Sequence, residues 1–442
     1  NSGLAPVQGS ASLLYGRGFA EDTFELASSL SFYDGSLAQL GIGAGLLLTS
    51  GDGAPPLSNT SDSYSSMLDP SYTDDALYQA VITGFPDAGE VQDVTALAFS
   101  FTVTNPAYNG VRFALVFGSD EFPEFADSDY VDIAAVWVNG VNYALFGGNT
   151  SQPLSVIERN LAAGGFIDNE NGALPIEYDG VSRVLTIVAP VQQGENTLRI
   201  AIGDTGDGVW DSGLFIANLR GVAHADGGLA TPFDGTAGND FFEGTAFRDL
   251  FTLGNGNDTA KGLAGDDVVD GGDGIDFAQY LGPRANYTIS IAPDKATVQA
   301  LAGDEGLDTL YNLERLAFSD MLTALDIEGN AGQAYRVYKA AFDRTPDLPG
   351  LSYWIHQLDL GHSMLDAAIG FIQSQEFKDL YGANTTNAQY TQALYQNVLD
   401  REPETAGYAY WNAVLDGVPL NGVFLGQTTR EQMLVDFSES VE

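Results

Sequence analysis

The sequence lacks cysteine and is poor in basic residues. Without cysteine, the chain can form neither disulfides nor thiolate metal sites. Its 17 Lys and Arg residues face 60 Asp and Glu residues, which gives a formal net charge of −43. This charge argues against electrostatic attraction to nucleic acid or to an anionic membrane, and it favours cations as partners. Because no apolar run reaches about 18 residues, we also expect no membrane-spanning helix and no membrane insertion.

Catalytic motifs are missing as well. The sequence contains no nucleophile elbow, no zinc-protease HExxH motif and no phosphate-binding loop. Its three histidines offer no metal or catalytic-triad context. We therefore expect that the chain is not an enzyme, and we keep a secreted hydrolase only as a third alternative.

The composition indicates folded domains. Hydrophobic residues make up 44% of the chain and aromatic residues 11%, which is too much for a disordered acidic protein. At roughly 100 to 200 residues per domain, the 442 residues predict two to four units. The negative charge should therefore lie on the surfaces of folded domains.

A glycine-rich stretch carries an aspartate at every ninth position. These aspartates are Asp240, Asp249, Asp258, Asp267 and Asp276. In each nonad the first six residues, rich in glycine, predict a tight turn, and the last three predict a short strand. The turn glycines are Gly235, Gly238, Gly254, Gly256, Gly262, Gly265, Gly271 and Gly274. The eighth place is always apolar, which an acidic linker would have no reason to maintain, so the pattern predicts a calcium-binding parallel β-roll.

Calcium would bind between stacked coils. Two nonads make one coil, so Asp240, Asp258 and Asp276 should follow one edge of the roll, and the other two aspartates the opposite edge. Calcium takes about six to eight oxygens, which stacked turns supply as backbone carbonyls plus one carboxylate per turn. The pairs 240/258, 258/276 and 249/267 allow up to three sites. We expect 249/267 to be the weakest pair, because Phe247 and, in the neighbouring unit, Leu253 replace turn glycines.

These nonads resemble those of the RTX proteins of Gram-negative bacteria. The resemblance implies export through a type I secretion channel in an unfolded state, followed by folding outside the cell, where calcium is abundant. The repeats have the charge for this: residues 234–276 contain ten acidic and two basic residues, so the roll should stay open until a divalent cation neutralises it. We therefore expect a secreted, extracellular or cell-surface protein with calcium as its cofactor.

Residues 1–228 predict an all-β domain. Short apolar or alternating runs at 96–103, 110–117, 133–138, 184–188, 197–202 and 214–219 suit a β-sandwich, and no helical stripe exceeds two turns. The segments GSDEFPEF and DTGDGVWDSG, with the runs around them, resemble the choice-of-anchor L domain of bacterial surface proteins over residues 20–222.

Two acidic clusters lie in loops of this domain. They comprise Asp120, Glu121, Glu124, Asp129 and Asp132 in one loop, and Asp204, Asp207 and Asp211 in another. Carboxylates crowded in this way repel one another unless a cation lies among them. The clusters therefore predict a second metal site if they converge at one end of the sandwich; solvated acidic loops are the alternative.

The roll, assigned to residues 229–281, should be closed by a β cap over 282–328 that buries Tyr287, Ile289, Val298, Leu313, Leu316 and Phe318. Residues 329–442 predict an all-α domain of two related units, because FDRTPDLPGLSYW returns 57 residues later as LDREPETAGYAYW. In each unit the arginine should pair with neighbouring acids, and the Tyr-Trp pair should anchor a small core. Both copies resemble a helical domain of unknown function found at the C-terminus of RTX and surface-layer proteins.

Taken together, these features predict a multidomain, mainly β protein. The function that we expect is that of a calcium-stabilised extracellular structural or adhesin-like protein, which self-assembles into a filament, a layer or a biofilm matrix. The alternative is a calcium-dependent, lectin-like carbohydrate-binding module of a surface adhesin. The expected partners are calcium and either further copies of the chain or a surface polysaccharide, and nucleic acid is not among them.

Overall fold

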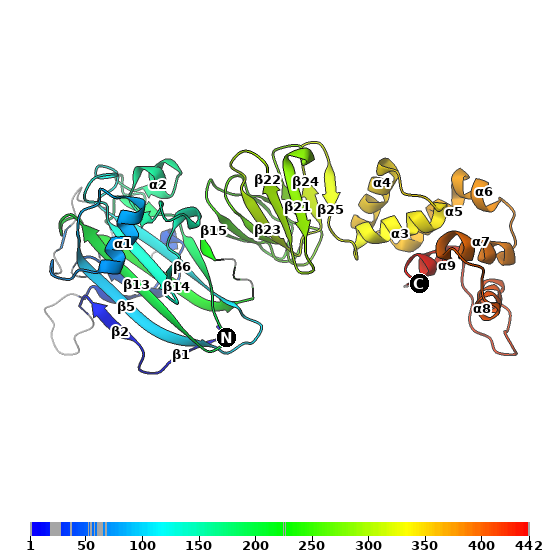
Figure 1. The fold of residues 1–442 in the computed structure, drawn as a ribbon, viewed down its shortest axis with the longest axis horizontal. Helices are drawn as coiled ribbons and strands as arrows, with labels where there is room; N and C mark the ends of the chain where they lie inside the picture. The colour runs from blue at the N-terminus through cyan, green and yellow to red at the C-terminus, as the bar shows by residue number, and fades with distance from the viewer. Residues whose placement is uncertain are drawn as a thin grey trace. The chain divides into compact units, whose positions relative to one another are not determined.

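The computed structural model describes residues 2–17, 28–35, 38–51, 53, 55–56, 58–59, 65–66, 69–223, 225 and 227–440. The chain divides into two compact units (Figure 1). The first comprises Asn1–Asn312 and Phe318–Asp320, and the second Leu313–Ala317 and Met321–Glu442. The first unit contains both the sandwich and the roll, and the second is mainly helical. The domain boundaries expected from the sequence stay predictions.

An antiparallel β-sandwich forms the N-terminal part of the first unit. One sheet has the order β1-β5-β13-β7-β8, with β2 beside β5 and β9 beside β7. Its strands are β1 (Leu4–Pro6), β2 (Ser12–Tyr15), β5 (Val91–Val103), β7 (Ile133–Val138), β8 (Val141–Asn142), β9 (Leu154–Ser155) and β13 (Glu195–Thr205). The other sheet has the order β12-β6-β14-β4-β3, with β11 beside β6 and β10 beside β11. Its strands are β3 (Leu30–Tyr33), β4 (Gly45–Thr49), β6 (Gly110–Ser119), β10 (Phe166–Asp168), β11 (Gly180–Ser182), β12 (Leu185–Pro190) and β14 (Ser212–Val222).

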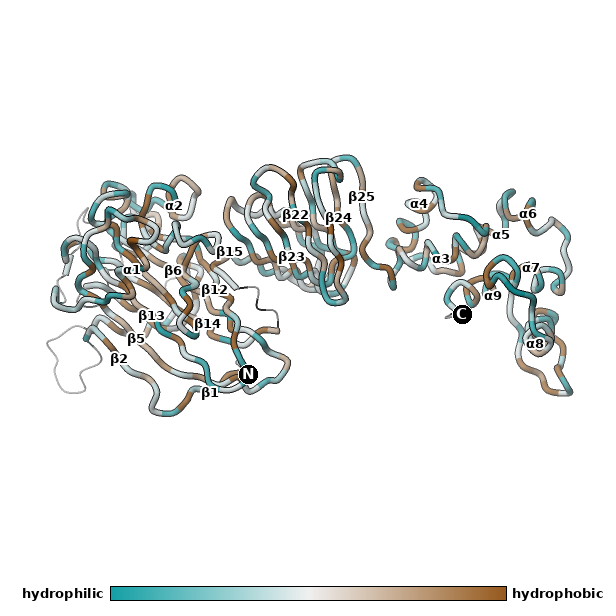
Figure 2. The backbone as a smooth tube through the Cα atoms, viewed as in Figure 1, coloured by the Kyte–Doolittle hydropathy of each residue, from teal (hydrophilic) through white to brown (hydrophobic). Residues whose placement is uncertain are grey.

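The two sheets bury one shared hydrophobic core. Phe101 and Ile200 from one sheet and Phe113 and Leu214 from the other belong to a single buried cluster. In Figure 2 hydrophobic residues follow the strands of this sandwich. The six strands expected from the sequence are present as β5, β6, β7, β12, β13 and β14, most of them longer than expected. The sandwich prediction is therefore confirmed.

One helix longer than two turns accompanies the strands of this region, although no helical stripe of that length appears in its sequence. Helix α1 (Asp75–Gly84) has ten residues, and its N-terminus is capped by the Asp74 side chain, which accepts hydrogen bonds from the amides of Ala76 and Leu77. Only Leu77 and Val81 are buried along it. The apolar stripe is therefore too short to stand out in the sequence. The described part of this region also contains shorter helical segments, namely α2 (Glu158–Ala162), η1 (Ala38–Leu40) and η2 (Phe146–Gly148).

Parallel strands follow the sandwich and form the predicted roll. They are β15 (Gly228–Asp234), β16 (Phe241–Glu243), β17 (Asp249–Thr252), β18 (Thr259–Lys261), β19 (Val268–Asp270) and β20 (Phe277–Gln279). One ladder joins β15, β17 and β19, and the other joins β16, β18 and β20. Partners lie 18 residues apart, as in Phe251↔Val269 and Ala260↔Ala278. The eighth-place side chains are buried at Phe251, Ala260, Val269 and Ala278 and half-buried at Phe242, so they form the core of the roll.

Strand β15 belongs to the sandwich and to the roll at once. Its first half pairs antiparallel with β12, as in Leu229↔Ile187, and its second half pairs parallel with β17, as in Phe233↔Phe251. Arg112 of β6 adds an ion pair to Asp234 at the end of β15, with 3.1 Å between nitrogen and oxygen. The sheet of the sandwich therefore continues into the roll without a linker.

A β-hairpin covers the end of the roll. Strands β21 (Tyr287–Ile291), β22 (Ala296–Ala300) and β23 (Leu307–Tyr311) pair antiparallel in turn, and β23 pairs parallel with β19. The rings of Tyr280, Tyr287 and Phe318 contact one another with centroids 5.1 to 5.2 Å apart. Of the expected cap residues, Tyr287, Val298 and Phe318 are buried and Ile289 is half-buried. Leu313 and Leu316 are also buried, but they belong to the second unit.

The second unit holds a short hairpin and the helical repeats. The hairpin is formed by β24 (Arg315–Ala317) and β25 (Leu322–Ala324). The helices are α3 (Asn330–Phe342), α4 (Leu348–Asp359), α5 (Met364–Gln373), α6 (Gln375–Tyr381), α7 (Asn387–Leu399), α8 (Thr405–Asp416) and α9 (Arg430–Ser438). Aromatic residues of both copies, among them Tyr338, Phe371, Tyr395 and Phe437, share one core. Among the residues that the structure describes, none of the helices has the length and apolar character needed to cross a membrane.

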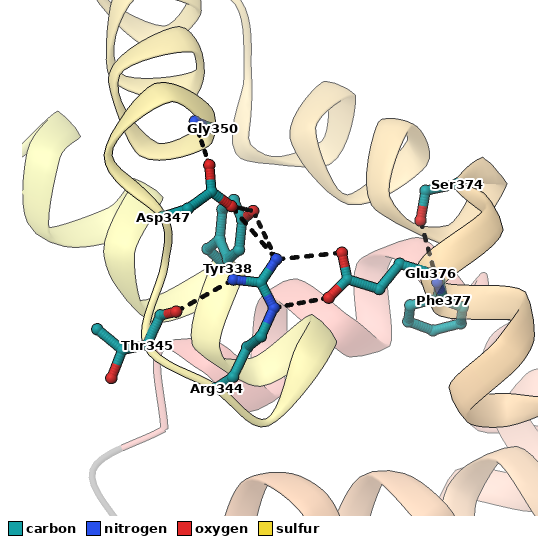
Figure 3. Close-up of polar contacts among 8 residues, drawn as sticks. All are labelled: Tyr338, Arg344, Thr345, Asp347, Gly350, Ser374, Glu376 and Phe377. Atoms are coloured by element: carbon teal, nitrogen blue, oxygen red, sulfur yellow. Dashed lines mark hydrogen bonds and ion pairs between the residues drawn. The ribbon is translucent and has the colours of Figure 1, made fainter.

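Each copy of the helical repeat contains the expected arginine contacts. Arg344 lies over the ring of Tyr338 and bonds to Asp347 and Glu376 (Figure 3). In the second copy Arg401 lies over the ring of Tyr395 and pairs with Glu404. The pairing of both arginines with neighbouring acids is confirmed.

The expected core role of the Tyr-Trp pairs is half right. Trp354 and Trp411 pack against the core, but Tyr353 is 55% exposed and Tyr410 is 42% exposed. Adjacent residues of a helix face about 100° apart, so only one member of each pair can face the core.

Candidate calcium sites in the roll

The predicted aspartates stack in two hydrogen-bonded ladders. On one edge the amide of Asp240 donates to Oδ1 of Asp258 at 2.7 Å, and the amide of Asp258 donates to Oδ1 of Asp276 at 2.8 Å. On the other edge the amide of Asp249 donates to Oδ1 of Asp267 at 2.8 Å. The coil of two nonads thus places the five carboxylates as the sequence predicts.

The second ladder has one more rung, which the sequence analysis missed. The amide of Asp267 donates to Oδ1 of Asp308 at 3.0 Å, and Asp308 is 6% exposed. Residues 303–311, GDEGLDTLY, are a sixth nonad, with Asp308 at the sixth place and the buried Leu310 at the eighth. A search for that pattern outside the strict period would have found it. The hairpin of β21 and β22 is inserted between the nonads, so the aspartate spacing changes from 18 to 41 residues.

The carboxylates fall into two groups by their remaining contacts. Oδ2 of Asp240 accepts a hydrogen bond from the amide of Thr236 at 2.6 Å, and Oδ2 of Asp249 accepts one from the amide of Thr245 at 2.6 Å. By contrast, Oδ2 of Asp258 and Oδ2 of Asp267 are buried and accept no hydrogen bond from any residue that the structure describes. A buried carboxylate oxygen without a donor requires another positive partner.

Glycine is required where one turn lies on the next. Gly256, Gly265 and Gly274 have φ of +125°, +119° and +146°, which side chains rarely adopt. A Cβ atom at Gly274 would also collide with the carbonyl oxygen of Gly256, and one at Gly265 would press on the carbonyl of Phe247. Gly254 likewise has a positive φ, whereas Gly235, Gly238, Gly262 and Gly271 do not. The carbonyls of one turn therefore point at the turn stacked on it.

Burial makes these aspartates hard to ionise without a cation. Desolvation raises the pKa of Asp249 and of Asp276 to about 6. Desolvation, and after it the neighbouring carboxylate of Asp308, raises the pKa of Asp267 to about 9. The pKa of Asp308 rises to about 7, again mainly through burial.

Three families match the chain. "Choice-of-anchor L domain" matches residues 14–219, and "RTX calcium-binding nonapeptide repeat (4 copies)" matches residues 234–260 and 243–278. "Domain of unknown function (DUF4214)" matches residues 330–380 and 368–442. The chain combines a choice-of-anchor L domain, RTX repeats and a C-terminal DUF4214 region. RTX repeats bind calcium as a structural ion, and together with the anchor domain they mark a secreted calcium-binding protein.

Individual relatives add little to this assignment. No curated protein matches the chain. Among solved structures, the extracellular lipase LipA from Serratia marcescens matches with a TM-score of 0.18 and 19% identity, over 20% of this chain and 14% of the lipase. A match over so small a share of the lipase carries no argument about activity.

The RTX roll fits calcium by the chemistry of the oxygen atoms that could ligate the ion. Among the described residues, no three His, Cys, Asp or Glu side chains are grouped so that they alone could hold a metal ion. The roll instead offers one carboxylate per turn, beside turns whose carbonyls face the next coil. Oδ2 of Asp258 and of Asp267 are buried, and no described residue donates a hydrogen bond to them. An all-oxygen set with few carboxylates suits calcium, which accepts backbone carbonyls readily.

The two residues that replace turn glycines are well packed. Phe247 is 9% exposed, and its ring lies 4.8 Å from that of Phe146 in the sandwich. Leu253 is fully buried. That 249/267 is the weakest pair stays a prediction, and Asp308 adds the pair 267/308 to the same edge, so that up to four pairs are present.

The acidic loops of the choice-of-anchor L domain are only partly brought together. Asp120, Glu121, Asp132, Asp204 and Asp211 are buried, Asp207 is half-buried, and Glu124 and Asp129 are exposed. Asp93, which no sequence motif marked, is fully buried near the same group and follows Gln92, the partner of Asp204 on β5. An isolated aspartate in a strand gave no signal in the sequence.

Proposed function

We propose that the chain is a calcium-stabilised extracellular structural or adhesin-like protein that assembles into a filament, a layer or a biofilm matrix. In this proposal the sandwich and the DUF4214 repeats make the contacts. The RTX roll folds when calcium is present and then serves as a rigid extension of the sandwich. No part of the chain acts as a catalyst.

The observation that carries the proposal is the shared strand β15. Residues of β15 hydrogen-bond to β12 of the sandwich and to β17 of the roll. A mechanical force on the sandwich is therefore transmitted to the roll through a continuous sheet. The roll itself has buried aspartates that repel one another until a cation binds. Calcium would thus close the roll, so that the sandwich and the roll of the first unit would form one stiff body.

Self-assembly is supported by the variety of surfaces on one chain. A β-sandwich and a helical repeat offer unlike surfaces, which suit head-to-tail contacts rather than a closed symmetric dimer. Contacts of this kind propagate when the rotation between copies does not close.

One observation favours the alternative function of carbohydrate binding. The sandwich has a cleft of about 910 Å³ lined by Trp137 and Tyr143 together with polar residues such as Gln79 and Asn142. Aromatic rings beside amide groups can stack on and hydrogen-bond a sugar.

Electron microscopy and sedimentation of the full chain would test these functions. We expect polymers in calcium that disperse after chelation, and none from the double variant Asp258→Asn/Asp267→Asn, whose roll cannot hold calcium normally. The matched control is Asp304→Asn, an exposed acid of the same region. Calcium-dependent binding of monomers to a glycan array would favour the carbohydrate-binding alternative. Turnover of a polysaccharide would refute the proposal.

A further inference from the structure

Two aspartates face each other at one end of the sandwich. Strands β13 and β7 run antiparallel, with Gly203 opposite Ile133, so the next position along both segments places Asp204 opposite Asp132. Side chains directly opposite one another on the same face have Cβ atoms about 4.5 to 5.5 Å apart, and like charges in such a pair are destabilising. Both residues are buried, with Asp132 0% and Asp204 1% exposed.

These carboxylates are short of donors. Oδ2 of Asp132 accepts hydrogen bonds from Ser212 at 2.6 Å and from Ser119 at 3.2 Å. Oδ1 of Asp132 and both oxygens of Asp204 are buried, and they accept no hydrogen bond from the residues that the structure describes. The Ser50 hydroxyl is close enough to lower the pKa of Asp204, but it donates to the carbonyl of Ser212 instead.

A third buried acid adds to the excess of negative charge. Glu121 is 3% exposed, and its Oε2 also has no hydrogen-bond partner in the described part of the chain. Burial, and after it the carboxylate of Asp132, raises the pKa of Glu121 to about 10. Among the described residues, no Lys or Arg forms an ion pair with Asp132, Asp204 or Glu121. Groups of this kind persist in a folded core only when a proton or a metal ion neutralises them.

The side chains around this pair that could ligate a metal ion come from both sheets and carry oxygen atoms. Asp132 and Asp204 lie at the ends of β7 and β13, and Ser212 begins β14 in the opposite sheet. Ser50 follows β4 and accepts a hydrogen bond from the Ser212 amide at 2.8 Å. Among the described residues, the side chains named here offer only oxygen atoms, which disfavours zinc and favours a hard cation. Asp132 and Asp204 supply two carboxylates, so such an ion would complete its shell with hydroxyl, carbonyl and water oxygens.

We propose that Asp132 and Asp204 bind one calcium ion between the two sheets of the sandwich, with Glu121 close by, at a site separate from the RTX roll. The exposed acids Glu124 and Asp129 are not ligands. The ion would tie the sheets together at this end and would make the anchor domain, and not only the roll, depend on calcium.

Hydrogen exchange of the full chain, measured by mass spectrometry in calcium chloride and in chelator, tests this proposal. We expect calcium to slow exchange in peptides covering residues 119–133 and 203–213, by about 100-fold at a calcium concentration about 100 times the dissociation constant. Peptides of residues 234–311 report on the roll in the same experiment, so failure of this site and failure of the roll are distinguishable.

Variants separate local binding from stabilisation that reaches the sandwich through β15. Asp204→Asn should lose the calcium effect in residues 119–133 and 203–213 and keep it in the roll, whereas Glu124→Gln should keep both. In chelator Asp204→Asn should fold at least as well as the wild type, because it removes an unpaired buried charge. If Asp204→Asn does not fold, Asp132→Asn provides the same comparison. The proposal is overturned if calcium slows exchange in the roll of the wild type but not in residues 119–133 and 203–213. It is also overturned if calcium still slows exchange in those two segments of Asp204→Asn and of Asp132→Asn.

Discussion

In the absence of calcium, the roll should lose stability as the pH rises. Burial raises the pKa of Asp249 and of Asp276 to about 6, from an ordinary value of 3.8. A group with a raised folded-state pKa contributes stability that is fully present below its unfolded pKa and is lost as the pH passes its folded pKa. Protons thus neutralise these carboxylates in acid, and the chelated roll should lose stability as the pH rises from about 4 through the folded-state pKa of about 6.

The size of the effect follows from these two aspartates. Each should cost about 1.4 kcal/mol, or a factor of ten in the opening equilibrium, between about pH 5 and about pH 8. They lie on different ladders, so their effects should add to about 100-fold. Asp267 and Asp308 change in the same direction, because their raised pKa values also fall in or above this range.

A single cysteine would report on this opening, since the chain has no other. We suggest Ala260→Cys, whose side chain is 1% exposed in β18, with the rate of thiol labelling in chelator divided by that of the denatured chain at the same pH. The control is Ala341→Cys, fully buried in α3, where labelling should not follow this pH dependence. In calcium the roll should stay closed at both pH values. Equal protection at both pH values in chelator, or stronger protection at the higher one, would show that the ladders are solvated and the reasoning is wrong.

Three further predictions concern single residues. Asp308→Asn should remove about one calcium ion per chain in equilibrium dialysis, because it deletes the last rung of one ladder. Phe251→Ala should destabilise the roll by about 3 to 5 kcal/mol and raise the calcium needed for protection of the roll in hydrogen exchange, because the ring is fully buried and stacks on Phe233 at 4.8 Å. Arg315→Ala should destabilise the second unit by about 3 to 5 kcal/mol in thermal unfolding, because it leaves the carboxylates of Asp326 and Asp359 without their buried partner.

Each of these has a matched control. Asp304→Asn, an exposed acid in the turn before Asp308, should keep the full calcium count. Phe241→Ala removes a ring that is 60% exposed and should cost little. Arg315→Lys keeps the positive charge and should destabilise the second unit less than Arg315→Ala does. An unchanged calcium count in Asp308→Asn would show that Asp308 does not bind calcium and that residues 303–311 are not a sixth nonad. If Phe251→Ala were as stable as Phe241→Ala, or Arg315→Ala as stable as Arg315→Lys, the packing described here would be contradicted.

Local regularity made much of the fold predictable from the sequence. The period of nine placed Asp240 to Asp276 in two ladders, because a turn of six residues and a strand of three need no distant partner to define them. The offset of 57 residues likewise revealed both helical units with their arginine contacts. Helix α1 was missed because it buries only two residues.

What the sequence determined by itself is therefore the calcium roll, its composition of nonads and the sandwich and helical classes beside it, since each depends on patterns between near neighbours. The tertiary structure decided three other matters. It placed Asp308 on the second ladder across an inserted hairpin, and it showed β15 to be shared by sandwich and roll. It also placed Asp132 opposite Asp204 in the interior, among the eight acids of the two acidic loops. All three depend on strand pairing between distant segments, and a spacing along the chain does not encode which segments pair.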